Sequence, residues 1–485
     1  MMANSFESFS RYRPFIDDWP AFVEMSQTPL PTCVWSHPLR IAERELAARL
    51  RQQGLTFDPV TWYDGAYLLP SDVKFGNSLE YSVGLCHVQE EVALIPVVLL
   101  DPKPAERVLD LCAAPGNKTA QMALRMQLSG TVIANDVTGN RMRAMRRVIS
   151  RLGLINVSTT LHNAATYPRQ DVLFDRVLAD VPCSCEGTSR KHPGVIAESG
   201  RERSLRLARL QTAILRRALQ LCKIGGRVVY STCTYAPEEN EMVVQAALDS
   251  LQPKIRAFIK PGNLQGFRFS PGVEKWRDQV FRKDMHNALR IYPHQNNTGG
   301  FFIAVIEKRE DAGQQVSKSR IKCDVQQSVQ SLRFFKEEEC LPWFEYLDDR
   351  FGIPVEIFSG LKVFRTNKKS IGIINDDHEP IVHPTPHFIG VPFFRTNMKY
   401  PKLTTAAALI FGQKARRNVL ELGEREVEVF LSSENISVAA GLDHGIDEGY
   451  VIAKFPKHTL GVGLLLQKPE GNILRSLYPK RWHVS

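Results

Sequence analysis

Two cysteines and an aspartate stand where predicted strands end, and their chemistry suits covalent catalysis. Asp180 and Cys183 follow one predicted strand, and Cys233 follows the next. Ligands bind beyond the carboxyl ends of strands in an open α/β sheet, so we expect the three side chains to converge on one cleft. A thiolate there can add to an electron-poor ring carbon, while a carboxyl group hydrogen-bonds the same ring.

A turn of small residues between Cys112 and Lys118 follows an earlier predicted strand. A dinucleotide site calls for three glycines in such a turn, and only Gly116 is present. This favours a cofactor without a pyrophosphate, such as S-adenosylmethionine, over NAD. Asp136 closes the following strand, where an acidic residue can hold ribose hydroxyls or act as a helix N-cap.

Methylation of cytosine at C5 would use both features. C5 is a poor nucleophile, so a thiolate must first add at C6, and a base must later remove the C5 proton before the thiolate leaves. The alternative for any one thiol is simple burial, which we expect for Cys86, Cys222, Cys323 and Cys340. The sequence contains no Cys-x-x-Cys motif, so we expect no metal site.

Short apolar strands alternate with amphipathic helices from Val108 to about Lys308, which is typical of βαβ units and a mostly parallel sheet. A helix is predicted over Ser204 to Leu221, with Gly225-Gly226 ending it. The predicted strands are Arg107 to Leu111, Thr131 to Asn135, Val157 to Leu161, Arg176 to Ala179, Arg227 to Tyr230 and Phe301 to Ile306.

A chain of 485 residues is expected to form two or three domains. We predict an N-terminal extension over 1–79, with a helix over Ala42 to Gln52, and the α/β domain over 80–310. A polar linker is predicted over 311–333. The segment 334–485 contains strand-like pieces such as Gly360 to Phe364 and Gly449 to Ala453, so we expect it to be β-rich.

Lys and Arg outnumber Asp and Glu by 62 to 52, and the net charge of +10 favours a polyanionic partner. The longest apolar run, Ala93 to Leu100, is far shorter than the roughly 20 residues of a membrane span. Nine cysteines without an apolar signal segment indicate free thiols. We therefore expect a cytoplasmic protein with no membrane partner.

Four segments of the chain resemble the Fmu/Sun family of RNA cytosine-5 methyltransferases. They are Asp110 to Thr119, Asp180 to Ser184, Ser231 to Thr234 and Thr298 to Phe302, with Gln89-Glu90 as a further match upstream. The resemblance covers about residues 80 to 308. It implies a Rossmann-like class I methyltransferase sheet, S-adenosyl-L-methionine as cofactor, RNA as substrate and a PUA-like, RNA-binding C-terminal region.

The resemblance also assigns roles to single residues. It implies that Cys233 is the nucleophile, that Cys183 assists product release and that Asp180 contacts both the cytosine and the cofactor. Asp136 would bind the ribose and Asn163 the adenine. The remaining implied cofactor contacts are Cys112, Ala113, Ala114, Pro115, Gly116, Asn117 and Lys118.

Two positions depart from the family pattern. Asn163 stands where an aspartate is common, and its carbonyl oxygen can still accept a hydrogen bond from the adenine amine. Cys185 stands where a glycine is usual, and the sequence gives it no role.

Two sets of segments bear on the RNA. The segments 187–191 and 360–364 resemble the multisite tRNA branch, whereas 461–466 and 477–481 are similar to the PUA-like tails of rRNA-modifying relatives. We expect a monomer acting on tRNA, with rRNA as the alternative. One predicted helix carries arginines that either contact phosphates or form a solvated face: Arg141, Arg143, Arg146, Arg147 and Arg151.

Two other classes of protein are weighed against this interpretation. A NAD-dependent oxidoreductase is disfavoured by the missing glycines of the turn. An RNA-binding protein with an inactive methyltransferase fold is disfavoured by Asp180, Cys183 and Cys233, because a scaffold needs no pair of thiols in one cleft.

Overall fold

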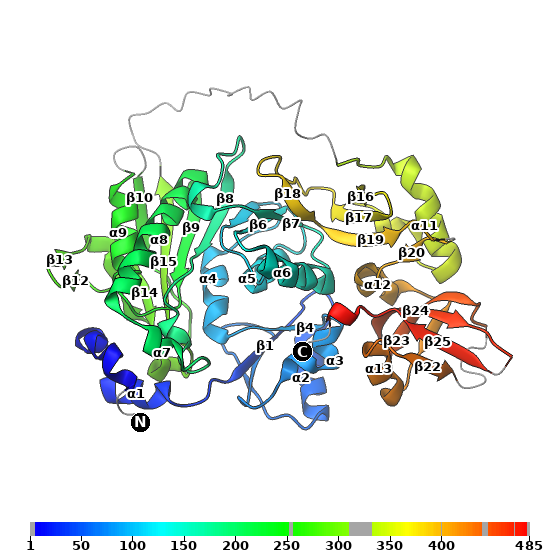
Figure 1. Cartoon of the computed structure of the whole chain (residues 1–485), viewed down its shortest axis with the longest axis horizontal. Coiled ribbons are helices and arrows are strands. Elements are labelled where there is room, and N and C mark those ends of the chain that lie inside the picture. Colours follow the sequence, from blue (N-terminus) through cyan, green and yellow to red (C-terminus); the bar gives the residue numbers. More distant parts are fainter. Residues whose placement is uncertain are drawn as a thin grey trace.

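The computed structural model describes residues 5–251, 256–309, 332–398, 400–438, 445–469 and 471–482 (Figure 1). Most of the predicted linker, together with Cys323, therefore lies outside the described residues. Among the described residues, no helix is long and apolar enough to cross a membrane.

A ten-stranded mixed sheet forms the centre of the molecule, in the order β11-β14-β15-β9-β8-β5-β6-β7-β18 with β10 beside β15. Its parallel strands are β5 (Arg107–Asp110), β6 (Thr131–Asp136), β7 (Val157–Leu161), β8 (Phe174–Asp180) and β9 (Cys222–Thr232). Its antiparallel strands are β10 (Arg256–Lys260), β11 (Ser270–Pro271), β14 (Leu289–Ile291), β15 (Phe301–Arg309) and β18 (Pro386–Ile389). The α/β, Rossmann-like fold and all six predicted strands are confirmed. The expectation of a mostly parallel sheet was wrong, because β15 and the strands added at the edges run antiparallel to their neighbours.

Helices cover both faces of this sheet, each with its own buried cluster of apolar side chains (Figure 1). On one face lie α4 (Ile95–Leu100), α5 (Asn117–Arg125) and α6 (Gly139–Leu152). On the other lie α8 (Arg201–Leu221) and α9 (Glu241–Asp249). The short helices α7 (Val195–Glu198) and α10 (Pro293–Asn296) and the hairpin β12 (Lys275–Trp276) and β13 (Gln279–Val280) lie in the connections.

The predicted helix end at Leu221 is confirmed, because helix α8 ends there. The role given to Gly225-Gly226 was wrong, since both glycines lie within β9. A β-carbon on Gly226 would lie 2.7 Å from the carbonyl oxygen of Asp175. The glycine therefore lets β9 approach β8 closely, which is a requirement of the sheet and not of the helix.

The N-terminal extension begins with a 3-10 helix, η1 (Ser5–Phe15), and α1 (Trp19–Ser26). A four-stranded sheet follows, made of β2 (Asp58–Pro59), β3 (Ala66–Leu69), β1 (Thr32–Ser36) and β4 (Cys86–Val88), with α2 (Glu43–Gln52) and α3 (Leu79–Ser82). The helix predicted over 42–52 is thus confirmed as α2.

Arg151 of α6 neither lies on a solvated face nor is accessible to a phosphate, so both roles expected for it from the sequence were wrong. Its side chain is buried, donates to the carbonyl oxygen of Cys86 at 3.1 Å and lies 3.8 Å from the centre of the Tyr81 ring. It therefore joins α6 to the N-terminal sheet. Arg141, Arg143, Arg146 and Arg147 are exposed.

The C-terminal region is β-rich, as expected, and contains two sheets. The first has β16 (Leu361–Asn367), β17 (Ser370–Asn375), β19 (Val391–Arg395) and β20 (Lys402–Leu403), beside α11 (Glu337–Phe351). The second has β21 (Val419–Glu421), β23 (Gly449–Phe455), β24 (His458–Leu466), β25 (Asn472–Ser476) and β22 (Asn435–Val438), beside α12 (Thr405–Phe411) and α13 (Glu424–Leu431). Strand β18 leaves this region and pairs with β7, placing Ile389 opposite Ser158.

Candidate active site

The carboxyl ends of the parallel strands carry the predicted site residues. Asp180 is the last residue of β8 and pairs in register with Ser231 of β9, two residues before Cys233. The small-residue turn follows β5, Asp136 ends β6, and Asn163 follows β7. All of them therefore lie along one edge of the sheet.

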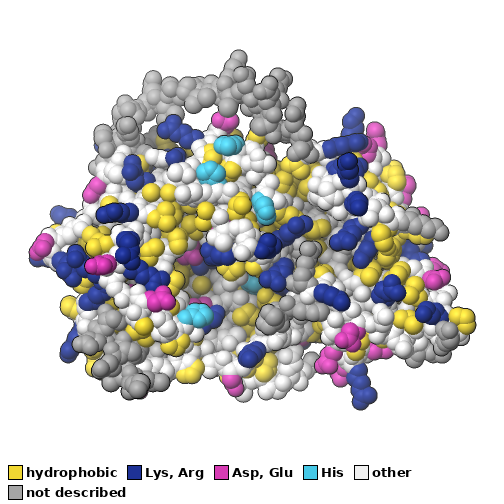
Figure 2. Space-filling model, viewed as in Figure 1, with side chains coloured by type: hydrophobic (Ala, Val, Ile, Leu, Met, Phe, Trp, Pro, Cys, Tyr) yellow, Lys and Arg dark blue, Asp and Glu magenta, His cyan; other side chains and the backbone are white. Residues whose placement is uncertain are grey.

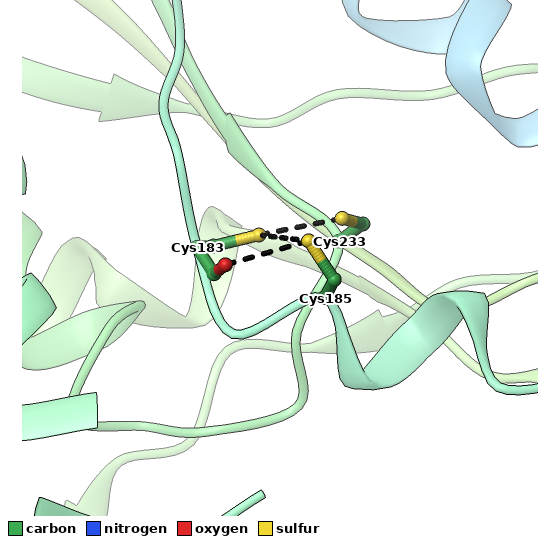
Figure 3. A group of neighbouring side chains, drawn as sticks. All are labelled: Cys183, Cys185 and Cys233. Carbon is green, nitrogen blue, oxygen red and sulfur yellow. Dashed lines mark hydrogen bonds between the residues drawn. The ribbon is translucent and has the colours of Figure 1, made fainter. Parts of the chain in front are cut away.

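Three thiols meet between the loops that follow β8 and β9 (Figure 3). The sulfur atom of Cys183 lies 3.3 Å from that of Cys233 and 4.0 Å from that of Cys185. Cys185 also lies 3.4 Å from the carbonyl oxygen of Cys183. The structure thus brings Cys183 and Cys233 together, and it adds Cys185, for which no role was predicted.

The pKa values of the three thiols in this cluster shift in different directions. Hydrogen bonds from Cys183 and Cys233 lower the pKa of Cys185 to about 3. The pKa of Cys183 is raised well above the usual range by its hydrogen bonds to Cys185 and Cys233 and by its burial. The hydrogen bond from Cys183 lowers the pKa of Cys233, but Cys185, burial and the charge of Asp180 raise it overall. A negative charge therefore forms readily within the cluster, on the sulfur that receives two hydrogen bonds.

Asp180 accepts hydrogen bonds on both of its carboxylate oxygens. Lys118 donates to one at 2.8 Å and Ser231 to the other at 2.7 Å. Burial lowers the pKa of Lys118, but the Asp180 carboxylate outweighs burial and raises it. Lys118, assigned to the cofactor turn, thereby also fixes the carboxylate of the catalytic loop.

A buried hydrogen-bond network holds the two thiol-bearing loops together. Thr234 accepts from Ser184 at 2.7 Å and donates to Glu186 at 2.9 Å, while Tyr12 of the N-terminal 3-10 helix donates to Glu186 at 2.7 Å. The backbone nitrogen of Gly187 donates to the carbonyl oxygen of Cys233 at 2.8 Å. Sequence reasoning missed Glu186 and Tyr12, and only the Cys-Glu-Gly context of Glu186 hinted at its place.

The glycines of Thr298-Gly299-Gly300 allow three chain segments to meet behind the thiols. A β-carbon on Gly299 would lie 2.0 Å from the Glu90 carboxylate, and one on Gly300 would lie 2.2 Å from the Tyr235 ring. The backbone nitrogen of Gly300 donates to the carbonyl oxygen of Gly187 at 2.8 Å. These glycines are therefore needed for close approach to the catalytic loops.

The turn after β5 fits a cationic nucleoside cofactor. Gly116 has a φ of +107°, and a β-carbon there would lie 2.9 Å from the Met145 side chain. Burial and the charges of Asp110, Asp180 and Asp136 raise the pKa of Cys112 well above its usual range. Three carboxylates thus surround the turn, which complements the positive charge of S-adenosylmethionine.

Asp136 and Asp110 differ in their hydrogen bonding. Asp136 accepts from the backbone nitrogens of Ala114 at 3.1 Å and Thr138 at 2.8 Å. It is not the N-cap of α6, because Thr138 occupies that position. Asp110 is buried, and one of its carboxylate oxygens has no partner among the described residues. That oxygen is shielded from solvent, so Asp110, which sequence reasoning overlooked, acts on the turn through its charge.

Asn163 is exposed at the carboxyl end of β7. Its side-chain oxygen accepts from the backbone nitrogen of Ala165 at 3.0 Å and caps a short 3-10 helix, η4 (Ala164–Thr166). The second lone pair of this oxygen is still able to accept a hydrogen bond from an amine. The residue is therefore compatible with the adenine contact implied for it.

Comparison with known proteins identifies the family of the chain. The family model for 16S rRNA methyltransferase RsmB/F matches residues 97–307. Over 295 residues the chain is 35% identical to the tRNA (cytosine(49)-C(5))-methyltransferase of Pyrococcus abyssi, covering 60% of this chain and 93% of that protein. The chain belongs to the RsmB/F family.

This RsmB/F family member is an S-adenosylmethionine-dependent RNA cytosine-C5 methyltransferase. It is also 27% identical to ribosomal RNA small subunit methyltransferase F of Shewanella piezotolerans, over 95% of this chain and 92% of that protein. A crystal structure of a methyltransferase homologue from Pyrococcus horikoshii aligns with a TM-score of 0.55 at 31% identity, covering 64% of this chain and all of that one. The relatives act on tRNA and on rRNA, so they do not resolve the branch.

Proposed function

We propose that this methyltransferase forms 5-methylcytosine through a covalent bond between Cys233 and C6 of the target base. The observation that carries the proposal is the 3.3 Å approach of Cys183 and Cys233 beside the hydrogen-bonded Asp180. The Cys233 thiol first loses the proton that its raised pKa retains, and its sulfur then adds to C6, which makes C5 nucleophilic. S-adenosylmethionine, held by the turn after β5, supplies the methyl group.

The other residues have separate tasks in this proposal. Asp180 hydrogen-bonds the pyrimidine edge, and Lys118 and Ser231 keep its carboxylate oriented. After methyl transfer, the C5 proton must leave so that the Cys233 sulfur can depart. Cys183 assists this release, and its contact with Cys233 supports that role.

The cofactor is proposed to lie along Cys112, Ala113, Ala114, Pro115, Gly116, Asn117 and Lys118, with Asp136 at the ribose and Asn163 at the adenine. Asp180 would border its methyl end. The buried carboxylate of Asp110 would attract its cationic portion through charge. The surrounding carboxylates support this placement through their charge.

Two RNA classes are candidates for the substrate. The end-to-end similarity to a small-subunit rRNA methyltransferase, which includes the C-terminal region, favours rRNA. The higher identity to an archaeal tRNA enzyme favours tRNA, as did the sequence analysis. We propose small-subunit rRNA first and tRNA second. We also propose a monomer that acts in the cytoplasm, where the free thiols among the described residues would stay reduced.

A basic cleft in the C-terminal region is proposed as a second RNA contact. It encloses about 940 Å³ and is lined by Arg146, Arg365, Arg395, Lys402, Lys480 and several aromatic rings. Arg395 and Lys402 stand directly opposite each other on β19 and β20. Like charges in that position repel, so a phosphate between them would relieve the repulsion. Figure 2 shows Lys and Arg side chains mixed with hydrophobic ones over this part of the molecule.

The N-terminal extension is proposed to contact RNA next to the target base. Its 3-10 helix packs against the catalytic loops through the hydrogen bond from Tyr12 to Glu186. Exposed side chains of this helix would then lie beside the RNA entering the cleft.

A covalent-trapping experiment tests the catalytic assignment. Purified Cys183→Ala protein incubated with RNA and S-adenosylmethionine should accumulate a protein–RNA complex that survives denaturing electrophoresis. Adding Cys233→Ala to this variant should abolish the complex, and Cys233→Ala alone should bind RNA without methylating it. A complex that forms in Cys233→Ala and is missing in Cys183→Ala would reverse the roles of the two thiols.

Bisulfite sequencing of RNA from cells with and without the protein identifies the substrate. Loss of 5-methylcytosine from small-subunit rRNA supports the first candidate. Loss from tRNA alone supports the second.

A further inference from the structure

The thiol of Cys185 has no task in the proposed reaction, yet the fold directs it toward the two that do. Cys185 has a φ of +63°, a left-handed conformation that residues with a β-carbon rarely adopt. A glycine would fit this backbone without strain. The strained conformation points the sulfur atom back toward Cys183, within 4.0 Å of its sulfur.

We propose that Cys183, Cys185 and Cys233 together bind a thiophilic divalent cation such as Zn²⁺. Their ligand atoms all lie within 4.8 Å of one another. Zinc bonded tetrahedrally to sulfur at about 2.3 Å requires sulfur atoms about 3.8 Å apart. Two of the three separations, 3.3 Å and 4.0 Å, lie on either side of this value, and the third is at most 4.8 Å. The sulfur atoms therefore need to shift by about 1 Å or less to bind the ion.

The three sulfur ligands determine which metal ions this site can bind. Three sulfur ligands select zinc and other soft cations, and they disfavour magnesium and calcium, which prefer oxygen. Binding displaces the protons that Cys183 and Cys233 hold, and a water molecule can complete the tetrahedron. Sequence reasoning excluded a metal because no Cys-x-x-Cys is present. That rule concerns ligands close together in sequence, whereas these ligands come from two loops.

Occupation of this site would stop the methyltransferase reversibly. This consequence rests on the proposed function, in which Cys233 attacks the base and Cys183 assists its release. Both sulfur atoms would be bonded to the metal, so neither could act. Cys185 is the residue that turns a catalytic pair into a three-ligand site.

Cd²⁺ titration of the full, reduced chain tests the binding directly. Cd²⁺ bonded to thiolates absorbs in the near ultraviolet, and the wild-type chain should show this band saturating at one equivalent. Cys185→Gly should weaken Cd²⁺ binding by more than about 100-fold, the upper limit for loss of an outer-shell partner. Cys340→Ala removes a buried thiol elsewhere and should bind Cd²⁺ as the wild type does. A missing band in the wild type, or equal affinity in Cys185→Gly, would overturn the site.

Methylation assays test the consequence separately. One equivalent of Zn²⁺ should inhibit the wild type, and a chelator should restore its activity. The activity that Cys185→Gly has without Zn²⁺ should not change when Zn²⁺ is added. A wild-type complex with Zn²⁺ that still methylates RNA would refute the inhibition. If the proposed catalytic roles are wrong, the trapping experiment fails but the Cd²⁺ band is still present. If the metal site is wrong, the Cd²⁺ band is missing whatever the trapping result, so the two failures are distinguishable.

Discussion

Lys118 donates a 2.8 Å hydrogen bond to Asp180 and so joins the cofactor turn to the catalytic loop. The two side chains are 14% and 26% exposed, which makes this a largely buried ion pair. In the proposed reaction, it links the residues that would hold the methyl donor to the carboxylate that would contact the methyl acceptor. Substitution of either residue should therefore affect both halves of the reaction.

Lys118→Met should lower the free energy of unfolding by about 3 kcal/mol, because it leaves a partly buried carboxylate without its cation. Chemical denaturation measures this change, and the methylation rate should fall with it. Lys103→Met is the matched control, since Lys103 pairs with Asp101 at 2.7 Å at an exposed site where ion pairs contribute little. Equal losses in the two variants would contradict a special role for Lys118.

S-adenosylmethionine should bind more tightly as the pH rises toward 7. Burial raises the pKa of Asp110 to about 7, so below that pH the residue is neutral. In the cofactor-free protein this raised pKa stabilises the fold at low pH, and the stabilisation is lost as the pH rises through 7. A cationic ligand favours the charged carboxylate, so its affinity follows the opposite trend. Calorimetry should show a gain of up to about tenfold per pH unit below 7.

Asp110→Asn provides the control for this pH dependence. Its side chain cannot ionise, so the affinity for S-adenosylmethionine should be nearly constant over the same pH range. The same slope in Asp110→Asn and the wild type would show that another group is responsible.

Gly299→Ala should destabilise the protein by about 1 to 3 kcal/mol through overpacking. The added methyl group would lie 2.0 Å from the Glu90 carboxylate and 3.0 Å from the carbonyl oxygen of Gly187. Gly194→Ala is the control, because nothing lies within 4 Å of its β-carbon position and its backbone is helical. Thermal denaturation compares them, and an unchanged melting temperature in Gly299→Ala would refute the crowding.

Charge reversal at Arg395 and Lys402 should weaken RNA binding and leave cofactor affinity unchanged. If both contact phosphates, the plot of log affinity against log salt should lose a slope of about 0.7 to 0.9 per residue. Reversal of Lys275 and Lys283, exposed residues outside the cleft, is the control. Equal RNA affinity and salt dependence in the cleft variant and the wild type would remove the cleft from the RNA-binding surface.

Short sequence patterns predicted those parts of the molecule that depend on residues close together in the chain. Strand periodicity located all six core strands, and their carboxyl ends then implied that Cys183 and Cys233 meet. Contacts between distant segments leave no periodic signal. The hydrogen bond from Tyr12 to Glu186, the third thiol of the cluster and the pairing of β18 with β7 were therefore visible only in the structure.

Strand β18 of the C-terminal region is part of the central sheet, and this pairing also constrains how the chain can fold during its synthesis. Strand β7 gains its outer neighbour only when residues 386–389 have left the ribosome, long after β15 has emerged. Until then β7 is an open edge with unpaired backbone groups, which favours pairing with other chains. The nascent protein therefore passes through a stage in which its catalytic half is nearly complete and prone to aggregation. Chaperones that cover exposed strand edges would be most needed at that stage.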